Sequence, residues 1–190
     1  YGTRLGLEVL RRFPAGVRRA VLDSVVPPDV DWVAESPVNF EQSLDRIEAA
    51  CDAQPRCQEV FGKLKARILA LAATLDANPV TLTLQGGKKA PGDGTLFLEL
   101  VHLAAYDPDG IAVLPEIVAQ IEEGNLRVFA RVVQLLVSGL VDRGMYFSVV
   151  CSDVTPLGSA EAARVRQAGV HPQLRTAADS AVIYEACRVW

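Results

Sequence analysis

The sequence has no apolar run long enough to cross a lipid bilayer, which needs about 18 to 20 consecutive apolar residues. Its most apolar stretch, residues 132–141, is interrupted by Gln134, Ser138 and Gly139. We therefore expect no membrane-spanning segment. A surplus of positive charge is also missing, because 23 acidic residues outnumber 19 basic ones and the net charge is −4. Proteins that bind a phosphate backbone carry clustered basic residues, so a nucleic-acid partner is not expected.

A complete catalytic or cofactor-binding motif is absent as well. The sequence contains no Gly-x-Ser-x-Gly elbow, no His-Glu-x-x-His zinc site, no P-loop and no Gly-x-Gly-x-x-Gly turn. The Gly-Gly-Lys-Lys run at 86–89 lacks the Ser or Thr of a Walker loop, so we interpret it as a turn with two solvated lysines. The two histidines, His102 and His171, are interpreted as packed or surface residues. We expect no metal and no other cofactor.

The first 36 residues have the pattern of half an α/β unit. Apolar residues over 3–13 predict a helix that ends at Pro14, and the β-branched run 17–26 predicts a buried strand that ends at Pro27. Parallel strands need neighbours to complete their hydrogen-bond ladders, and this chain offers few. We therefore expect most of the sheet to lie outside this sequence.

Residues 37–190 have a predominantly helical pattern. Apolar residues at helical spacing predict seven helices, at 40–53, 54–77, 94–106, 111–123, 126–140, 159–169 and 177–189. Asn39 and Ser159 are the candidate caps of two of them. Alternating or β-branched runs predict short strands at 80–84 and 145–151. The chain is thus expected to hold two units, a partial core at 1–36 and a helical module at 37–190.

Four cysteines allow two interpretations. Cys51 and Cys57 flank a Pro-containing turn, at a spacing too wide for a zinc knuckle or a redox Cys-x-x-Cys pair, so a short-loop disulfide is possible on geometry. Pairing of Cys151 with Cys187 would complete a second bridge and imply an oxidising compartment. Four reduced, partly buried thiols are the alternative, and the spacing alone does not choose between them.

The opening segment resembles a known family. Residues 1–14, which begin Tyr-Gly-Thr, and residues 17–29 resemble the sequence after the nucleophile in the tripeptidyl aminopeptidase and proline iminopeptidase branch of α/β hydrolases. In that family the elbow is Gly-x-Ser-Tyr-Gly-Thr. The resemblance implies a nucleophilic serine immediately before Tyr1, whose backbone N–H would supply one oxyanion-hole donor. Gly2 lets the following helix pack closely under the turn.

The resemblance extends over the helical module, which is similar to that family's cap, or lid, domain. The similar segments are 39–51, Cys57, 106–108, 145–151 and 187–190. It implies the disulfides Cys51–Cys57 and Cys151–Cys187 and a secreted or cell-envelope location. It also places the Asp and His of the catalytic triad beyond Trp190, so the fragment alone is expected to be inactive.

One departure from the family concerns substrate recognition. Members usually carry Cys-x-Glu-Asp, whereas this sequence has Cys151-Ser152-Asp153-Val154 and keeps a single carboxylate. An exopeptidase must bind the α-ammonium of its substrate, so Asp153 is the candidate for that role. A turn- or helix-capping aspartate is the alternative. The lost acid weakens the aminopeptidase hypothesis relative to a carboxylesterase.

The sequence therefore predicts the lid-bearing part of a secreted serine hydrolase that releases short N-terminal peptides or single residues. A carboxylesterase of the same fold is one alternative, with an ester as substrate. A non-catalytic helical module for binding or oligomerisation is another. Exposed apolar residues between 5 and 26 would favour self-association.

Overall fold

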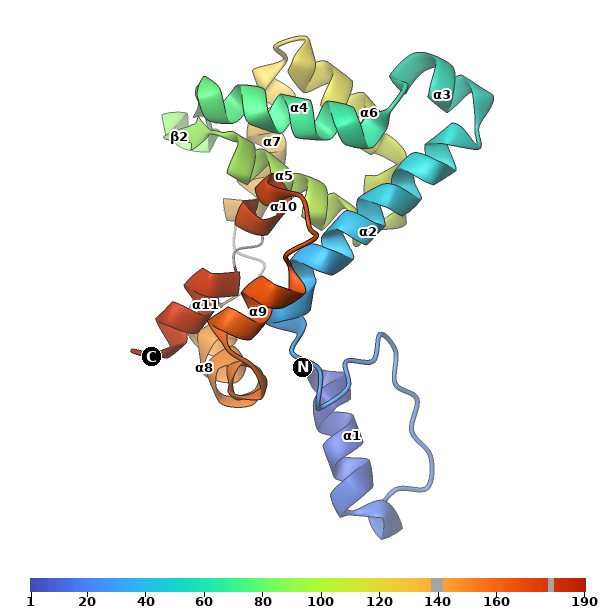
Figure 1. Ribbon diagram of the computed structural model, residues 1–190, viewed down its shortest axis with the longest axis vertical. Helices are drawn as coiled ribbons and strands as arrows, with labels where there is room; N and C mark the ends of the chain where they lie inside the picture. The colour runs from blue at the N-terminus through green and yellow to red at the C-terminus, as the bar shows by residue number, and fades with distance from the viewer. Residues whose placement is uncertain (138–141, 178–179) are drawn as a thin grey trace.

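The computed structural model describes residues 1–137, 142–177 and 180–190. Within them the chain is mostly helical, with one two-stranded sheet. Figure 1 shows a helical body and an N-terminal arm that stands apart from it. The arm comprises residues 1–31 and the body begins at α2. No helix in the described ranges is long and apolar enough to cross a membrane.

The arm consists of α1 (Gly2–Arg12), a short 3-10 turn η1 (Pro14–Gly16) and an irregular segment that leads to α2. The predicted strand at 17–26 is wrong, because that segment has no regular structure and Val21 is 96% exposed. A β-branched run forms a strand only where a neighbour completes its ladder, and no described residue does so here. A hydrogen bond joins α1 to this irregular segment: the Oγ1 of Thr3 accepts the N–H of Val26 at 3.2 Å.

Helix α2 (Trp32–Asp52) begins well before the cap predicted at Asn39. Its cap is Asp31, whose carboxylate accepts the N–H of Ala34 at 3.2 Å. Pro37 lies inside the helix near its N-terminal end, where it removes one backbone donor without ending the helix. The early start lets this one helix pack with its first turn against α9 and α11 and with its later turns against α4.

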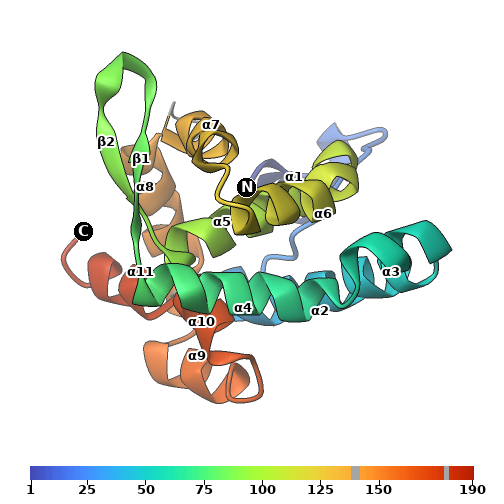
Figure 2. The ribbon, with the colours of Figure 1, turned by 90° about the horizontal axis from the view of Figure 1, so that it is seen from above.

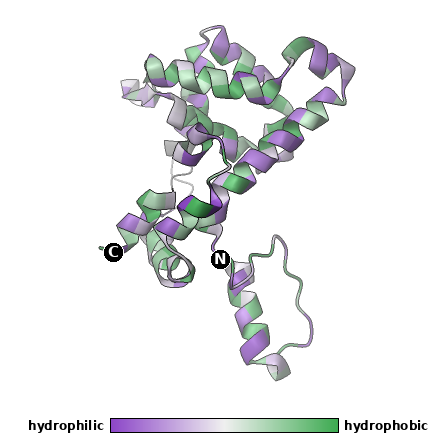
Figure 3. Cartoon of the chain, viewed as in Figure 1, coloured by the Kyte–Doolittle hydropathy of each residue, from purple (hydrophilic) through white to green (hydrophobic). Residues whose placement is uncertain are grey.

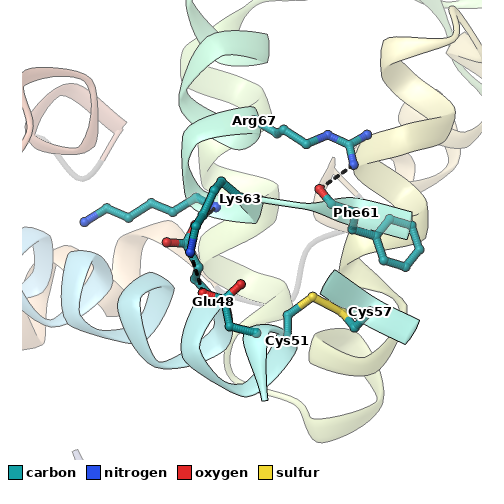
Figure 4. The surroundings of a disulfide bond; sticks show 8 residues. Glu48, Cys51, Cys57, Phe61, Lys63 and Arg67 are labelled. Carbon is teal, nitrogen blue, oxygen red and sulfur yellow. Dashed lines mark hydrogen bonds and ion pairs between the residues drawn. A yellow bond between two sulfur atoms is a disulfide. The ribbon is translucent and has the colours of Figure 1, made fainter. Parts of the chain in front are cut away.

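The predicted helix at 54–77 is two helices, α3 (Pro55–Phe61) and α4 (Leu64–Ala77). Gly62 breaks the run with a φ of 60°, a left-handed conformation that glycine adopts at little cost. The Cys51–Cys57 disulfide ties the end of α2 to α3, with 5.2 Å between the Cα atoms (Figure 4). Beside it Arg67 donates to the carbonyl of Phe61 at 2.8 Å, which holds α4 against the end of α3.

The strand predicted at 80–84 is confirmed as β1 (Val80–Thr83), which pairs antiparallel with β2 (Lys89–Gly92). The two strands are joined through the 3-10 turn η2 (Gln85–Gly87), so the Gly-Gly-Lys-Lys run forms the end of a hairpin, as expected of a turn. Figure 2 shows this hairpin projecting from the helices.

Three further helices complete the main core: α5 (Gly94–Ala104), α6 (Pro108–Glu122) and α7 (Leu126–Val137). Asp93 and Asp107 cap the first two of them. The last part of the helix predicted at 126–140 lies outside the described residues. The main core gathers fully buried side chains from α2, α4, β1 and these helices, of which the largest are Phe40, Phe97, Phe129, Leu44, Leu64, Ile68, Leu82, Leu98 and Leu114.

A smaller second core lies at the base of the body. It is built from the start of α2 and from α8 (Arg143–Asp153), α9 (Ala160–Arg166) and α11 (Ser180–Cys187), with the turn η3 (Thr155–Leu157) between α8 and α9. The predicted cap Ser159 is confirmed, since its hydroxyl accepts the N–H of Ala162 at 3.1 Å. The helix predicted at 177–189 is α11, shorter than expected, and residues 178–179 lie outside the described ranges.

Two elements of this lower region differ from the expectation. The predicted strand at 145–151 is wrong, because those residues lie within helix α8. Asp142 caps that helix by accepting the N–H of Met145 at 2.7 Å. A short apolar run is compatible with either structure, and this one has a helix cap before it and no strand beside it within the described ranges. A short helix α10 (Pro172–Ala177), which was not predicted, packs against α5 and the main core.

Candidate functional site

The candidate site is a pocket of about 310 Å³ where the start of the arm meets α2 and α8, named here the N-terminal pocket. Tyr1 and Asp153, the two residues given site roles from the sequence, both line it. The other lining residues are Arg4, Val26, Trp32, Met145, Tyr146, Val149, Val150 and Val154. The fold therefore brings together two candidate residues that lie far apart in the sequence.

One face of helix α8 forms a wall of the pocket. Tyr146, Val149, Val150 and Asp153 recur at spacings of three and four residues, which places them on one face of the helix. Trp32, at the start of α2, meets Tyr146 edge to face, with 6.2 Å between ring centroids and 63° between ring planes. The wall is mainly apolar, and Asp153 is the only carboxylate among its described residues.

Helix α8 is held in place by its link to the C-terminal helix. The Cys151–Cys187 disulfide joins α8 to α11, with 5.1 Å between the Cα atoms, and Asp153 follows two residues later. Phe147 of the same helix packs on Trp190, with ring centroids 5.3 Å apart. Together with Cys51–Cys57, this confirms the pairing that the family resemblance implied and fits an oxidising compartment.

Arg4 is a site residue that the sequence analysis missed. It is only 8% exposed, and its guanidinium donates to the carbonyl of Val30 at 3.2 Å and to the carbonyl of Pro28. An irregular, proline-containing loop leaves carbonyl groups without ladder partners, and a side-chain donor is one way to satisfy them. The prolines in the sequence indicate an irregular loop, but they do not indicate which arginine donates to its carbonyl groups. Arg4 thereby positions the loop that connects the pocket to α2.

The charges of the pocket are balanced. Arg4 brings one positive charge and Asp153 one negative charge, and neither forms an ion pair within the described ranges. The capping role considered for Asp153 finds no support, because η3 has no side-chain cap and α9 is capped by Ser159. The carboxylate is exposed at the pocket and open to a ligand cation.

The remaining candidate residues lie elsewhere. His102 packs on Phe40 with ring centroids 4.5 Å apart, and burial lowers its pKa below the usual 6.5. His171 begins the turn before α10, and its backbone N–H donates to the carboxylate of Glu41 at 3.2 Å. Both match the interpretation as packed or surface residues. Across the described ranges no three His, Cys, Asp or Glu side chains are grouped so that they could hold a metal ion.

Comparison with known proteins gives no identification: no family model, no curated protein and no solved structure matches this chain.

Proposed function

We propose that this chain is the lid of a serine hydrolase together with the segment that follows its nucleophile, and that the enzyme releases short N-terminal peptides or single residues. The observation that carries the proposal is the meeting of Tyr1 and Asp153 in one pocket. The family resemblance gave these residues complementary roles, and nothing in their sequence positions requires them to be neighbours.

The pocket geometry supports a simple division of roles. A serine before Tyr1 would attack the substrate carbonyl at the rim, and the Tyr1 backbone N–H would donate to the developing oxyanion. Asp153 would bind the substrate α-ammonium in a charge-assisted hydrogen bond, while Val149, Val150 and Met145 contact its side chain. A volume of about 310 Å³ is at the low end for small-ligand pockets, which favours one or two residues over a long chain.

The exposed apolar surface of the arm is a second observation that supports the hydrolase proposal. Leu5 and Phe13 are 56% and 66% exposed, and the β-branched run 17–26 has no strand beside it. Such side chains are normally covered, and the missing sheet of an α/β core is the cover that the resemblance implies. The same surface explains why the arm on its own would favour self-association.

A carboxylesterase of the same fold is the second candidate. Val154 occupies the position of the family's second acid, and it is 1% exposed and packed in the second core. The pocket therefore has one carboxylate and a largely apolar wall, which also suits an acyl ester without a free amine. The two candidates differ in whether Asp153 is needed.

The test is to express the complete coding frame around this segment and treat the protein with a fluorophosphonate probe. We expect the label on a serine directly before Tyr1. Labelling elsewhere, or none in a folded protein, would contradict the hydrolase proposal. In the same protein, Asp153→Asn should raise KM for unblocked peptides by about tenfold or more and leave N-acetylated esters unchanged.

The matched control is Asp109→Asn, which makes the same chemical change on the exposed first turn of α6, away from the pocket. Equal effects of the two variants would remove Asp153 from substrate binding. Strong hydrolysis of acyl esters with no activity on unblocked peptides would select the carboxylesterase.

A further inference from the structure

A second and larger hollow lies on the other side of the Trp32–Tyr146 pair. It measures about 840 Å³ and runs between α2, α5, α8 and the segment around α10 and α11; it is named here the aromatic groove. Trp32 and Tyr146 line both hollows, so this edge-to-face pair is their shared wall. The described residues of the groove all belong to the helical body, and none of them comes from the arm.

Aromatic rings dominate one end of the groove. His102 lies between Phe40 and Tyr106, with ring centroids at 4.5 Å and 5.4 Å. Tyr106 is 77% exposed, although it is a large ring directly after α5. Trp32, Tyr146, His102 and Tyr106 all line the groove, from α2, α8, α5 and the segment after α5, whereas Phe40 is buried behind His102. Such an arrangement attracts cations, because the face of an aromatic ring carries partial negative charge.

Glu99 gives the groove its charge. It is the only acidic residue in the described lining, which contains no lysine or arginine. His102 adds no positive charge at neutral pH, since burial lowers its pKa. The described groove is therefore negative, whereas the N-terminal pocket has one charge of each sign.

Glu99 has no ion-pair partner among the described residues, although Arg143 is near enough to affect its pKa. None of the ion pairs of the described chain involves it. Partial burial raises its pKa, the nearby charge of Asp93 raises it further, and Arg143 lowers it. A carboxylate in this position gains from a ligand cation in two ways: it gains a partner, and the cation relieves repulsion from Asp93.

We infer that the aromatic groove binds an organic cation on an apolar stem, of the chemical class of an arginine or lysine side chain in a peptide. Glu99 pairs with the charged end, and the rings of Trp32, Tyr106 and Tyr146 surround it. The apolar stem lies along Val182 and Ile183 of α11. The inference stands independently of the proposed hydrolase function, because every described residue of the groove belongs to the helical body.

The test uses the intrinsic fluorescence of Trp32. The chain has two tryptophans, so Trp190→Phe leaves Trp32 as the sole reporter and keeps a ring on Phe147. This protein is titrated with Nα-acetyl-arginine amide and, in parallel, with Nα-acetyl-citrulline amide, which has nearly the same shape and no charge. We expect saturable quenching by the arginine compound, with an affinity about tenfold or more above that of the citrulline compound.

Two pairs of variants locate the effect. Glu99→Gln should abolish the preference for arginine, whereas Glu59→Gln, on the exposed surface of α3, should leave it intact. Tyr106→Leu should weaken arginine binding by roughly two- to fivefold, and Tyr106→Phe should not. Circular dichroism of each variant checks that the helical fold is retained.

Equal binding of the two compounds would overturn the inference, as would full arginine preference in Glu99→Gln. Absence of quenching at millimolar concentration in the folded protein would overturn it as well. None of these results bears on the serine before Tyr1, so this inference and the hydrolase proposal fail or stand separately.

Discussion

The helical body and the N-terminal arm contain similar apolar side chains, but only the body buries them. Phe97 of α5 is 1% exposed in the main core, whereas Phe13 at the end of α1 is 66% exposed. Figure 3 shows hydrophobic residues on the arm although no other element covers it. The difference lies in the available partners: helices of the body cover one another, while the arm contacts little beyond its own loop. Apolar sequence alone therefore does not create a core.

The largest expected effect is the loss of a buried phenylalanine. Phe97→Ala removes a ring that packs edge to face on Phe129 at 6.2 Å, and it should lower the free energy of unfolding by about 3–5 kcal/mol. Phe13→Ala in the arm should change it by less than about 0.5 kcal/mol. Urea unfolding monitored by circular dichroism measures both. Similar losses in the two variants would mean that the arm is packed in solution.

The two disulfides of the body should stabilise it to different extents. Replacing Cys151 and Cys187 by Ala opens a loop of 36 residues and should cost roughly 4 kcal/mol in the chain-entropy view. The same change at Cys51 and Cys57, only 6 residues apart, should cost roughly 2 kcal/mol. Unfolding midpoints of the two double variants give the order, and a reversed order would contradict this ranking.

We expect copies of the chain to associate through the exposed apolar residues of the arm and not through the body. Phe13→Ser replaces an exposed ring by a hydroxyl, so it should lower the fraction of dimer or larger species at high concentration. Light scattering after size-exclusion chromatography measures that fraction. Val165→Ser is the control, because Val165 is an equally exposed apolar residue of α9, 73% accessible. If the control acts as strongly as Phe13→Ser, the arm is not the contact surface.

The smallest expected effect is a pH dependence that originates in the body. Burial lowers the pKa of His102, so the unfolded chain binds a proton more readily. The stability that this histidine contributes is complete above pH 6.5 and is lost as the pH falls through its folded pKa. His102→Asn should therefore show a shallower decline in unfolding free energy below pH 6.5 than the parent chain. A parallel decline in both proteins would exclude His102 as its source.

Much of the local structure was predictable because it depends on short-range chemistry. Ser159 caps α9 as expected, and the alternating run at 80–84 forms a strand that turns back through two glycines. Failures occurred where short β-branched or aromatic runs allow two structures. The run at 145–151 became a helix because Asp142 caps it and α11 packs on it, while 17–26 has no neighbouring strand among the described residues.

The candidate site was predictable only in part. Tyr1 and Asp153 came from a family resemblance, but their shared pocket depends on how the arm lies against α8. Arg4 and Glu99 were not found, because neither belongs to a motif and their roles arise from neighbours distant in sequence.

By itself the sequence determined the helical character of the chain, the strand that begins the hairpin and the Ser159 cap, since each depends on residues close together in the chain or on their periodicity. The cysteine pairing came from the family resemblance and not from spacing. Only the tertiary structure decided which runs would be strands. It also decided which side chains would line the N-terminal pocket and the aromatic groove. The physical reason is that burial and hydrogen-bond partners come from distant segments, and they select among local structures of similar free energy.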